Sequence, residues 1–289
     1  MVIVFLLGLL GIIFGSFVNA LVWRTHEQSV IATKTGARKG KGSKAKGGKA
    51  LTAAELSIVK GRSMCSECHH VLAAKDLVPV LSWLWLKGKC RYCGAKIQDS
   101  PLVELATGIL FAVSYVAWPY DFKGAELLQF VFWLAFLVGF VTLAVYDLRW
   151  FLLPDKLVFP LTGLAALQVV IVAVWEHSFS SLWMPACGAA IIFGLFWLLY
   201  QVSKGTWIGG GDVKLAIILG LLAGTPLRAL GVIFFASLIG TVASIPQLMK
   251  GRQGLTQRIP FGPSLLLATV IAVLWGARIG SWYQSLVIR

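Results

Sequence analysis

The sequence predicts an all-α polytopic membrane protein with about eight transmembrane helices and one large loop between the first two. Three observations support this fold class. The 289 residues are 58% hydrophobic and only 13% charged, and the mean hydropathy is +0.81. Apolar windows of about 20 residues recur along the chain, as membrane-spanning helices require. Basic residues gather in alternate connections, which is typical of a chain that crosses a membrane repeatedly. A single soluble domain is therefore excluded.

The apolar windows give the expected helices in order. They cover residues 2–23, 101–119, 127–146, 153–175, 183–202, 211–225, 227–248 and 262–283. The first window has no basic segment before it and no small-residue cleavage site after it, so we expect it to remain as the first span rather than act as a removable signal peptide.

The placement of Lys and Arg predicts the orientation. Of the 26 basic residues, 22 lie in residues 24–100 and in the three connections on the same side of the membrane, and 4 lie on the other side. Because basic loops are retained in the cytoplasm, the large loop should be cytoplasmic and both termini should lie outside.

These boundaries give three parts: a first transmembrane helix (1–23), a cytoplasmic loop (24–100) and a seven-helix core (101–289). Within the loop, residues 33–50 are rich in Lys and Gly and have no apolar periodicity, so we expect a disordered segment. It is either a solvated linker or a contact to the anionic inner leaflet. Because no aromatic residues interleave it, nucleic acid is not expected as a partner despite the net charge of +14.

Two C-x-x-C pairs occupy the same loop. Cys65 with Cys68 and Cys90 with Cys93 have close to the spacing of a structural four-thiolate zinc site. Two disulfides are the alternative, but they are rare in a reducing cytoplasm. His69 and His70 could replace a thiolate ligand, although four cysteines already complete a closed site. We therefore predict a zinc knuckle over residues 65–93, with Gly94 at the following tight turn.

Two aspartates lie at the ends of apolar windows, where an ionisable group is costly and is a functional candidate by default. Asp147 ends the third window, and Asp212 follows the glycines of residues 209–211. Alone, Asp147 is explained by a helix-end pair with Arg149. Since both aspartates are predicted at the same depth on the cytoplasmic side, a shared site is the better hypothesis.

The glycines support that hypothesis. The window at 211–225 is too short to cross a bilayer comfortably, and short Gly-interrupted segments are tolerated where they line a water-filled cavity. Two adjacent carboxylates can share one proton, so that one acts as a base and the other as an acid. This pattern predicts peptide hydrolysis within the membrane. A proton- or ion-coupled transporter that uses the same carboxylates is the alternative.

Six sequence blocks in order resemble the type IV prepilin peptidases, the G-x-G-D membrane aspartyl proteases. The resemblance runs from about residue 8 to residue 270. Its blocks are GSFVN with Arg24, the two C-x-x-C pairs, PLVEL at 101–105, the stretch 147–155, the stretch 209–214 and PFGP at 260–263.

The resemblance implies that Asp147 and Asp212 are catalytic and that precursors of type IV pilins or pilin-like proteins are cut at the cytoplasmic face of the bacterial inner membrane. Many relatives also methylate the new amino terminus with S-adenosylmethionine, and the resemblance links Gly15 and Glu104 to that activity. It assigns substrate binding or active-site support to Gly209, Gly211, Lys214, Asp155, Pro260, Phe261, Gly262 and Pro263.

Overall fold

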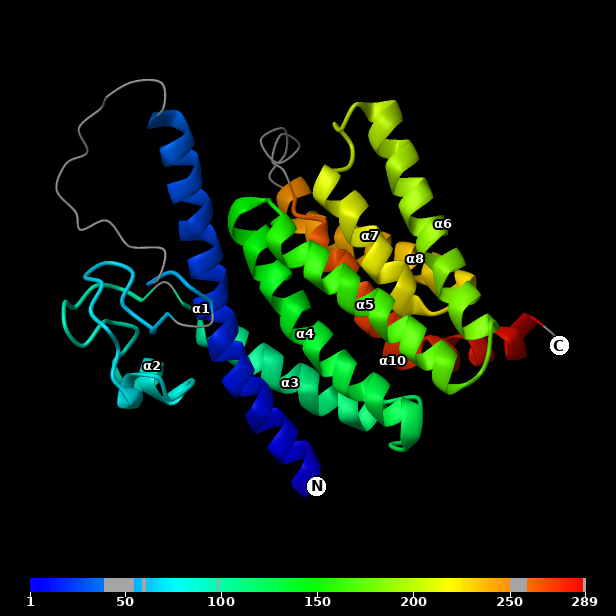
Figure 1. Cartoon of the computed structure of the whole chain (residues 1–289), viewed down its shortest axis with the longest axis horizontal. Helices are drawn as coiled ribbons and strands as arrows, with labels where there is room; N and C mark the ends of the chain where they lie inside the picture. Colours follow the sequence, from blue (N-terminus) through cyan, green and yellow to red (C-terminus); the bar gives the residue numbers. More distant parts are fainter. Residues whose placement is uncertain (39–54, 59–60, 98, 250–258, 288–289) are drawn as a thin grey trace. The chain divides into compact units, whose positions relative to one another are not determined.

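The structure is a computed structural model that describes residues 1–38, 55–58, 61–97, 99–249 and 259–287. The regular elements within these ranges are all helices, and only two isolated β-bridges accompany them. The chain divides into two compact units, Met1–Val113 and Ser114–Arg289. Figure 1 labels the helices of both units.

Eight longer helices lie at the eight predicted windows. They are α1 (Val2–Arg38), α3 (Pro101–Ala117), α4 (Gly124–Trp150), α5 (Asp155–Trp175), α6 (Ser180–Ser203), α7 (Gly210–Ala223), α8 (Pro226–Leu248) and α10 (Gly262–Val287). The loop after α1 adds the short 3-10 helix η1 (Ala74–Asp76) and α2 (Leu81–Trp85). In the described part of the chain, six helices are long and apolar enough to cross a membrane, whereas α3 and α7 are shorter. The protein is therefore a multi-pass membrane protein.

The first helix continues well beyond its predicted end at residue 23. It runs to Arg38, so the prediction of a disordered segment from residue 33 is wrong for residues 33–38; residues 39–50 lie outside the described residues. No proline interrupts the sequence here. The extension is also held by a returning segment, because the buried guanidinium of Arg24 donates hydrogen bonds to the carbonyls of Ser57, Ile58 and Gly61 at 3.0–3.2 Å.

In the first unit, α1 and α3 pack through small residues. A Cβ atom added to Gly15 would lie only 2.5 Å from the Cα of Glu104, so the two backbones touch at this point. Glycine permits such close approach because it has no side chain. Gly15 therefore has a structural reason to be glycine, apart from any chemical role.

We expect Gly15→Ala to destabilise the first unit. The added methyl group meets backbone, which cannot move aside as a flexible side chain can, and such overpacking typically costs about 1–3 kcal/mol. Thermal unfolding of the purified protein should show a lowered Tm. Gly163→Ala is the matched control, because nothing lies within 4 Å of its added Cβ; its Tm should stay constant or rise. An unchanged Tm for Gly15→Ala would contradict the packing described above.

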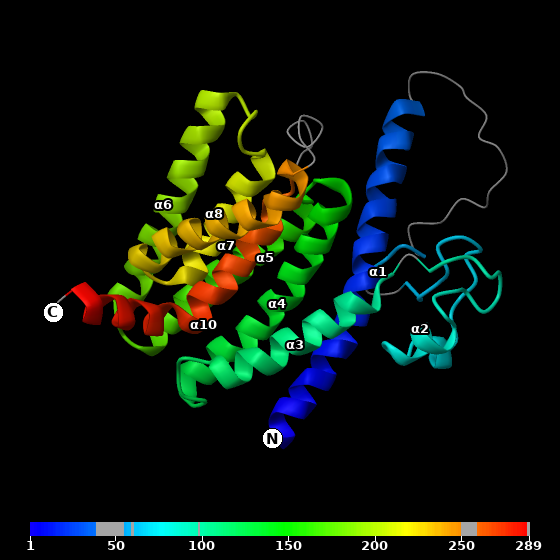
Figure 2. The ribbon, with the colours of Figure 1, turned by 180° about the vertical axis from the view of Figure 1, so that it is seen from behind.

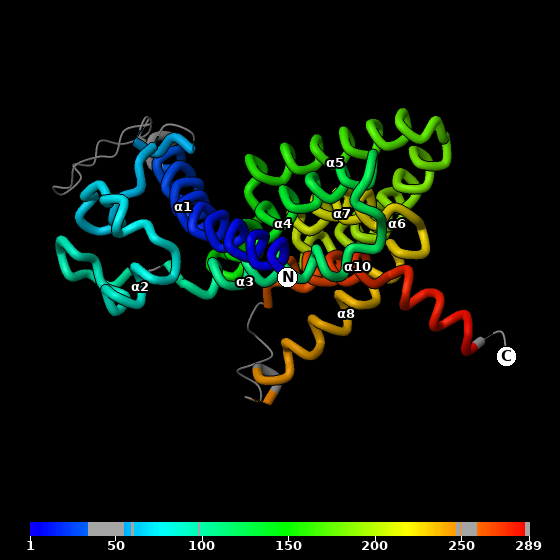
Figure 3. Tube along the Cα trace, turned by 90° about the horizontal axis from the view of Figure 1, so that it is seen from below, coloured from blue at the N-terminus to red at the C-terminus, as the bar shows by residue number. Residues whose placement is uncertain are grey.

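The second unit is arranged around the short helix α7. This helix contacts α5, α6, α8 and α10, and the tube view shows it among α5, α6 and α10 (Figure 3). Its side chains Leu215, Ala216, Ile218 and Leu219 are fully buried. Because protein surrounds it, α7 does not need the length of a lipid-exposed span, and its first turn is held at one fixed place within the unit.

Candidate active site and metal centre

Asp147 lies in the last turn of α4. The predicted window ended one residue earlier, but the helix continues to Trp150, and Phe151 then ends it in a left-handed conformation with its amide bonded to the Asp147 carbonyl at 2.8 Å. The Asp147 residue is only 6% exposed. A carboxylate at this position is thus removed from water, and partners in the protein must stabilise it.

Asp212 lies in the first turn of α7. Gly209 is the N-cap, Gly210 and Gly211 are the first two helical residues, and the Asp212 amide donates a hydrogen bond to the Gly209 carbonyl at 3.1 Å. The side chain turns back toward the cap, since a Cβ on Gly209 would be 3.6 Å from Asp212 Oδ2. The positive end of the helix dipole stabilises negative charge at this position.

Asp147 and Asp212 lie close enough to interact electrostatically. The structure thus brings together two residues that are separated in the sequence by two whole helices, α5 and α6. The C-terminal end of α4 and the N-terminal ends of α7 and α10 lie at the same end of the second unit (Figure 2). This proximity is what a shared site requires, and the catalytic pairing of the two aspartates stays a prediction.

A third helix end completes this arrangement. The amide of Gly262, the first residue of α10, donates a hydrogen bond to Asp147 Oδ2 at 3.2 Å. There is no room for a side chain, because a Cβ on Gly262 would be 2.6 Å from the same oxygen. The PFGP block therefore reaches Asp147 through Gly262, while Phe261 packs against Phe196 with ring centroids 6.4 Å apart.

Lys214 and Asp155 form an ion pair near the site. Lys214 Nζ is 2.7 Å from Asp155 Oδ1, and both side chains are about half exposed. Asp155 is the first residue of α5 and Lys214 is the fifth of α7, so the pair joins the N-terminal parts of the two helices. Pairs with this exposure contribute little stability, about 0–1 kcal/mol. The resemblance assigned substrate binding or active-site support to both residues, but the sequence did not indicate that they pair.

Glu104 is placed in the first unit beside Gly15, as the resemblance grouped them. Its carboxylate accepts a hydrogen bond from the Val80 amide at 2.5 Å and also interacts with the Ser16 side chain. Gly15 packs directly against the backbone of Glu104. A role of either residue in methylation stays a prediction.

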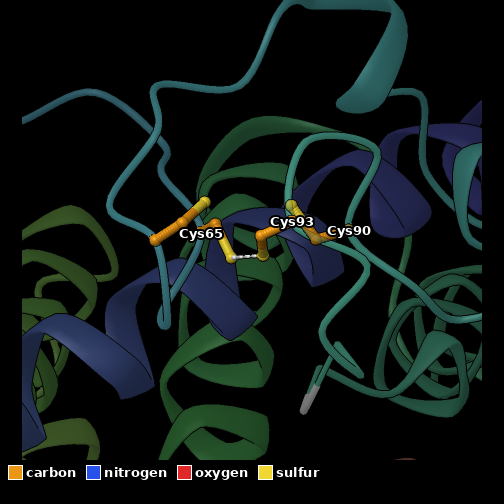
Figure 4. A group of neighbouring side chains, drawn as sticks. Cys65, Cys90 and Cys93 are labelled. Carbon is orange, nitrogen blue, oxygen red and sulfur yellow. Dashed lines mark hydrogen bonds between the residues drawn. The ribbon is translucent and has the colours of Figure 1, made fainter.

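The four predicted cysteines form one cluster. All four Sγ atoms lie within 4.8 Å of one another. Cys65 Sγ and Cys93 Sγ are 3.9 Å apart (Figure 4), far beyond a disulfide bond and close to the edge of about 3.8 Å expected for a tetrahedral zinc–thiolate site. Burial opposes ionisation of the Cys90 thiol, but hydrogen bonds from the Cys93 and Tyr92 backbone outweigh it and lower the Cys90 pKa to about 7. The cluster fits a metal ion.

The two C-x-x-C turns have the same backbone form. In the first turn, the amide of His69 donates a hydrogen bond to the carbonyl of Cys65. In the second turn, the amide of Gly94 donates to the carbonyl of Cys90 in the same way. Both residues have a positive φ, 55° for His69 and 72° for Gly94. The turn expected at Gly94 is confirmed, and His69 serves as its counterpart in the first turn.

Side chains outside the cluster brace it. Asp76 accepts hydrogen bonds from Arg91 at 2.7 Å and from Tyr92 at 3.0 Å, and His70 stacks on Tyr92 with centroids 3.7 Å apart. Burial opposes ionisation of Asp76, but these two donors together hold its pKa below the ordinary value. Sequence analysis named His70 only as a possible ligand and missed the other three residues, because no spacing rule indicates which side chains pack around a cysteine pair.

We expect Asp76→Asn to weaken metal retention without removing a ligand. The amide loses the charge that holds Arg91 and Tyr92 beside Cys90, and such supporting changes typically cost about 10- to 100-fold in metal affinity. Competition with a chromophoric zinc chelator measures this effect. Glu67→Gln is the control, since Glu67 is exposed within the first turn. Equal zinc release from the Asp76→Asn variant and the wild type would show that the brace has no influence.

These features define a helical multi-pass membrane protein with a carboxylate pair at converging helix ends and a separate four-cysteine centre. Residues 9–118 match the bacterial peptidase A24 N-terminal domain, and residues 133–245 match the type IV leader peptidase family. The chain belongs to the type IV leader peptidase family.

Curated relatives extend the similarity over nearly the whole chain. The Pseudomonas aeruginosa protein named prepilin leader peptidase/N-methyltransferase is 34% identical over 95% of this chain and 91% of its own length. The protein of the same name from Stutzerimonas stutzeri is 32% identical over 95% of this chain and 91% of its own length. The Bacillus subtilis one is 32% identical over 81% of this chain and 89% of its own length. No solved structure matches the chain.

Proposed function

We propose that this protein is a membrane aspartyl endopeptidase of the bacterial inner membrane that removes the leader peptide from type IV pilin or pilin-like precursors. The observation that carries the proposal is the meeting of Asp147 and Asp212 at the end of α4 and the start of α7. The family membership supports the peptidase activity, and the names of the relatives support the prepilin substrate.

The chemistry requires the two carboxyl groups in different protonation states. The ionised group accepts a proton from water as the water oxygen attacks the peptide carbonyl. The protonated group donates to that carbonyl oxygen, and a proton then passes to the leaving amine as the C–N bond breaks. Two carboxylates in close contact resist simultaneous ionisation, and this favours a single proton shared by the pair.

The surrounding helix ends suit this pair. The first turns of α7 and α10 present partial positive charge to Asp212 and Asp147, and this charge stabilises the single negative charge of the pair. The Gly209–Gly211 turn lets an extended substrate backbone approach closely because it has no side chains. The excess of basic residues in the connections on one side supports a cytoplasmic location for this end of the second unit.

Zinc is the proposed metal of the second centre. Cys65, Cys68, Cys90 and Cys93 would hold it in a closed tetrahedral site that supplies folding stability to the loop and no chemistry. The relatives' names also include an N-methyltransferase, so we propose methylation of the new amino terminus as a second activity that uses S-adenosylmethionine.

A mass measurement tests both activities. Purified protein in lipid nanodiscs is incubated with a synthetic precursor that carries a short basic leader, a glycine and an apolar helix, with and without S-adenosylmethionine. We expect a product shortened by the leader in both reactions and one additional methyl mass only with the donor. An intact precursor, together with ion flux that depends on a transmembrane gradient, would overturn the proposal in favour of a transporter.

A further inference from the structure

A ridge of exposed apolar side chains lies on the large loop, outside the six candidate spans. It consists of α2 and the turn before it, and its members are Leu77, Val78, Leu81, Leu84 and Trp85. Leu81 is 62% exposed, Leu84 58% and Trp85 86%. These last three have the i, i+3, i+4 spacing of one helix face. An apolar face of this kind marks an interaction site, because water is a poor environment for it.

A hydrogen bond fixes the depth of this ridge. The Val80 amide, directly before α2, donates to Glu104 in the first turn of α3. Figure 1 accordingly shows α2 beside the start of α3. Glu104 in turn touches Gly15 of α1. Gly15 lies roughly eight residues, or about 12 Å along the helix, before the end of the predicted apolar window at residue 23. The ridge is therefore held beside the apolar part of α1, at membrane depth and within reach of acyl chains.

The charges around the ridge are basic. Lys75, Lys87 and Lys89 flank it and are exposed, whereas the acidic residue closest in sequence, Asp76, is buried against Arg91. An apolar helix face with Trp at one end and Lys around it is typical of a segment that lies in the surface of an anionic membrane. A second copy of this chain, with a net charge of +14, would instead bring like charge toward the lysines.

We propose that the α2 ridge inserts into the lipid bilayer, in the leaflet at which α3 begins, and that it thereby anchors the four-cysteine loop to the membrane surface. Leu81, Leu84 and Trp85 contact acyl chains and glycerol, and the three lysines bind anionic headgroups. This surface is distinct from the Lys/Gly-rich segment at residues 33–50 and does not depend on the peptidase activity.

A photo-cross-linker placed on the ridge tests the proposal. Benzoylphenylalanine replaces Trp85 in the full-length protein, which is reconstituted in nanodiscs that contain phosphatidylglycerol and then irradiated. We expect a protein mass increased by one phospholipid. The matched control carries the same probe at Arg62, which is exposed. Its neighbour Gly61 accepts a hydrogen bond from Arg24, just past the end of the apolar window of α1. The probe at position 62 should therefore give no lipid adduct.

Binding partners other than lipid would give different cross-linked products. Cross-links from position 85 to a second copy of the chain, or to an added precursor in place of lipid, would overturn the proposal, as would an unmodified protein.

A further variant tests the lysines: Lys75→Gln, Lys87→Gln and Lys89→Gln together should lower the yield of the lipid adduct and abolish its dependence on phosphatidylglycerol. A yield that depends on the anionic lipid as strongly as in the wild type would refute the headgroup contacts.

Discussion

Replacing either Asp147 or Asp212 by Asn is expected to abolish precursor cleavage. Asparagine has nearly the same shape, but it can neither accept a proton from water nor give one to the leaving amine. General acid–base catalysis contributes about 100- to 10,000-fold to a rate, and the loss should be at least of this order. Because the two groups act as one unit, the double variant should be no slower than either single one.

The measurement is the initial rate of leader removal by purified variants in nanodiscs. Glu126→Gln is the matched control, since Glu126 is also a carboxylate of α4 but lies in its first turn, at the opposite end of the helix from Asp147; its effect should be small. If either Asn variant at 147 or 212 cleaves at the rate of the wild type, that residue is not part of the catalytic pair.

Gly262→Ala is expected to lower the cleavage rate strongly while the protein stays folded. The new methyl group would lie 2.6 Å from Asp147 Oδ2, in the space the carboxylate occupies. Asp147 must then move away from the α10 amide that now holds it at 3.2 Å. A displacement of about 1 Å at a reacting group can cost about 100-fold in rate, and we expect a loss of this order.

Gly280→Ala separates this effect from a general effect of alanine in α10. It lies in the same helix, and nothing is within 4 Å of the added Cβ, so its rate should equal that of the wild type. Both variants should keep the Tm of the wild type within a few degrees. A Gly262→Ala protein with full activity would mean that Asp147 does not need its present position.

The sequence predicted the positions of the helices well because apolar windows depend only on composition and length. It also predicted the cysteine cluster, since ligand spacing is local. It missed the extension of α1 to Arg38 because the helix is supported there by Arg24 and the returning segment, which no periodicity reveals. It likewise missed the contacts from Asp76 to Arg91 and from Lys214 to Asp155, because such pairs depend on how distant turns meet.

For the candidate active site, the sequence identified Asp147 and Asp212 as candidates. That their side chains lie close together was only an expectation. The position of Gly262 against Asp147 shows why that step needs a structure. The PFGP block was included through resemblance alone, and the reason for its glycine is a single close contact between α10 and α4. Likewise, the brevity of α7 was evident from the sequence, but the surrounding helices that make a short helix possible were not.

Disulfide trapping measures whether the side chains at positions 147 and 212 meet. Asp147→Cys and Asp212→Cys are combined with Cys187→Ser, which removes the cysteine outside the four-cysteine cluster. The zinc-loaded protein is oxidised in nanodiscs, and the linked peptides are identified by mass spectrometry. We predict a linked pair of the peptides that contain residues 147 and 212. The control moves one cysteine to the neighbouring Leu148, which is 58% exposed, and should give little of the linked pair. Absence of the 147–212 link, or equal yield from the control, would contradict a shared site for the two aspartates.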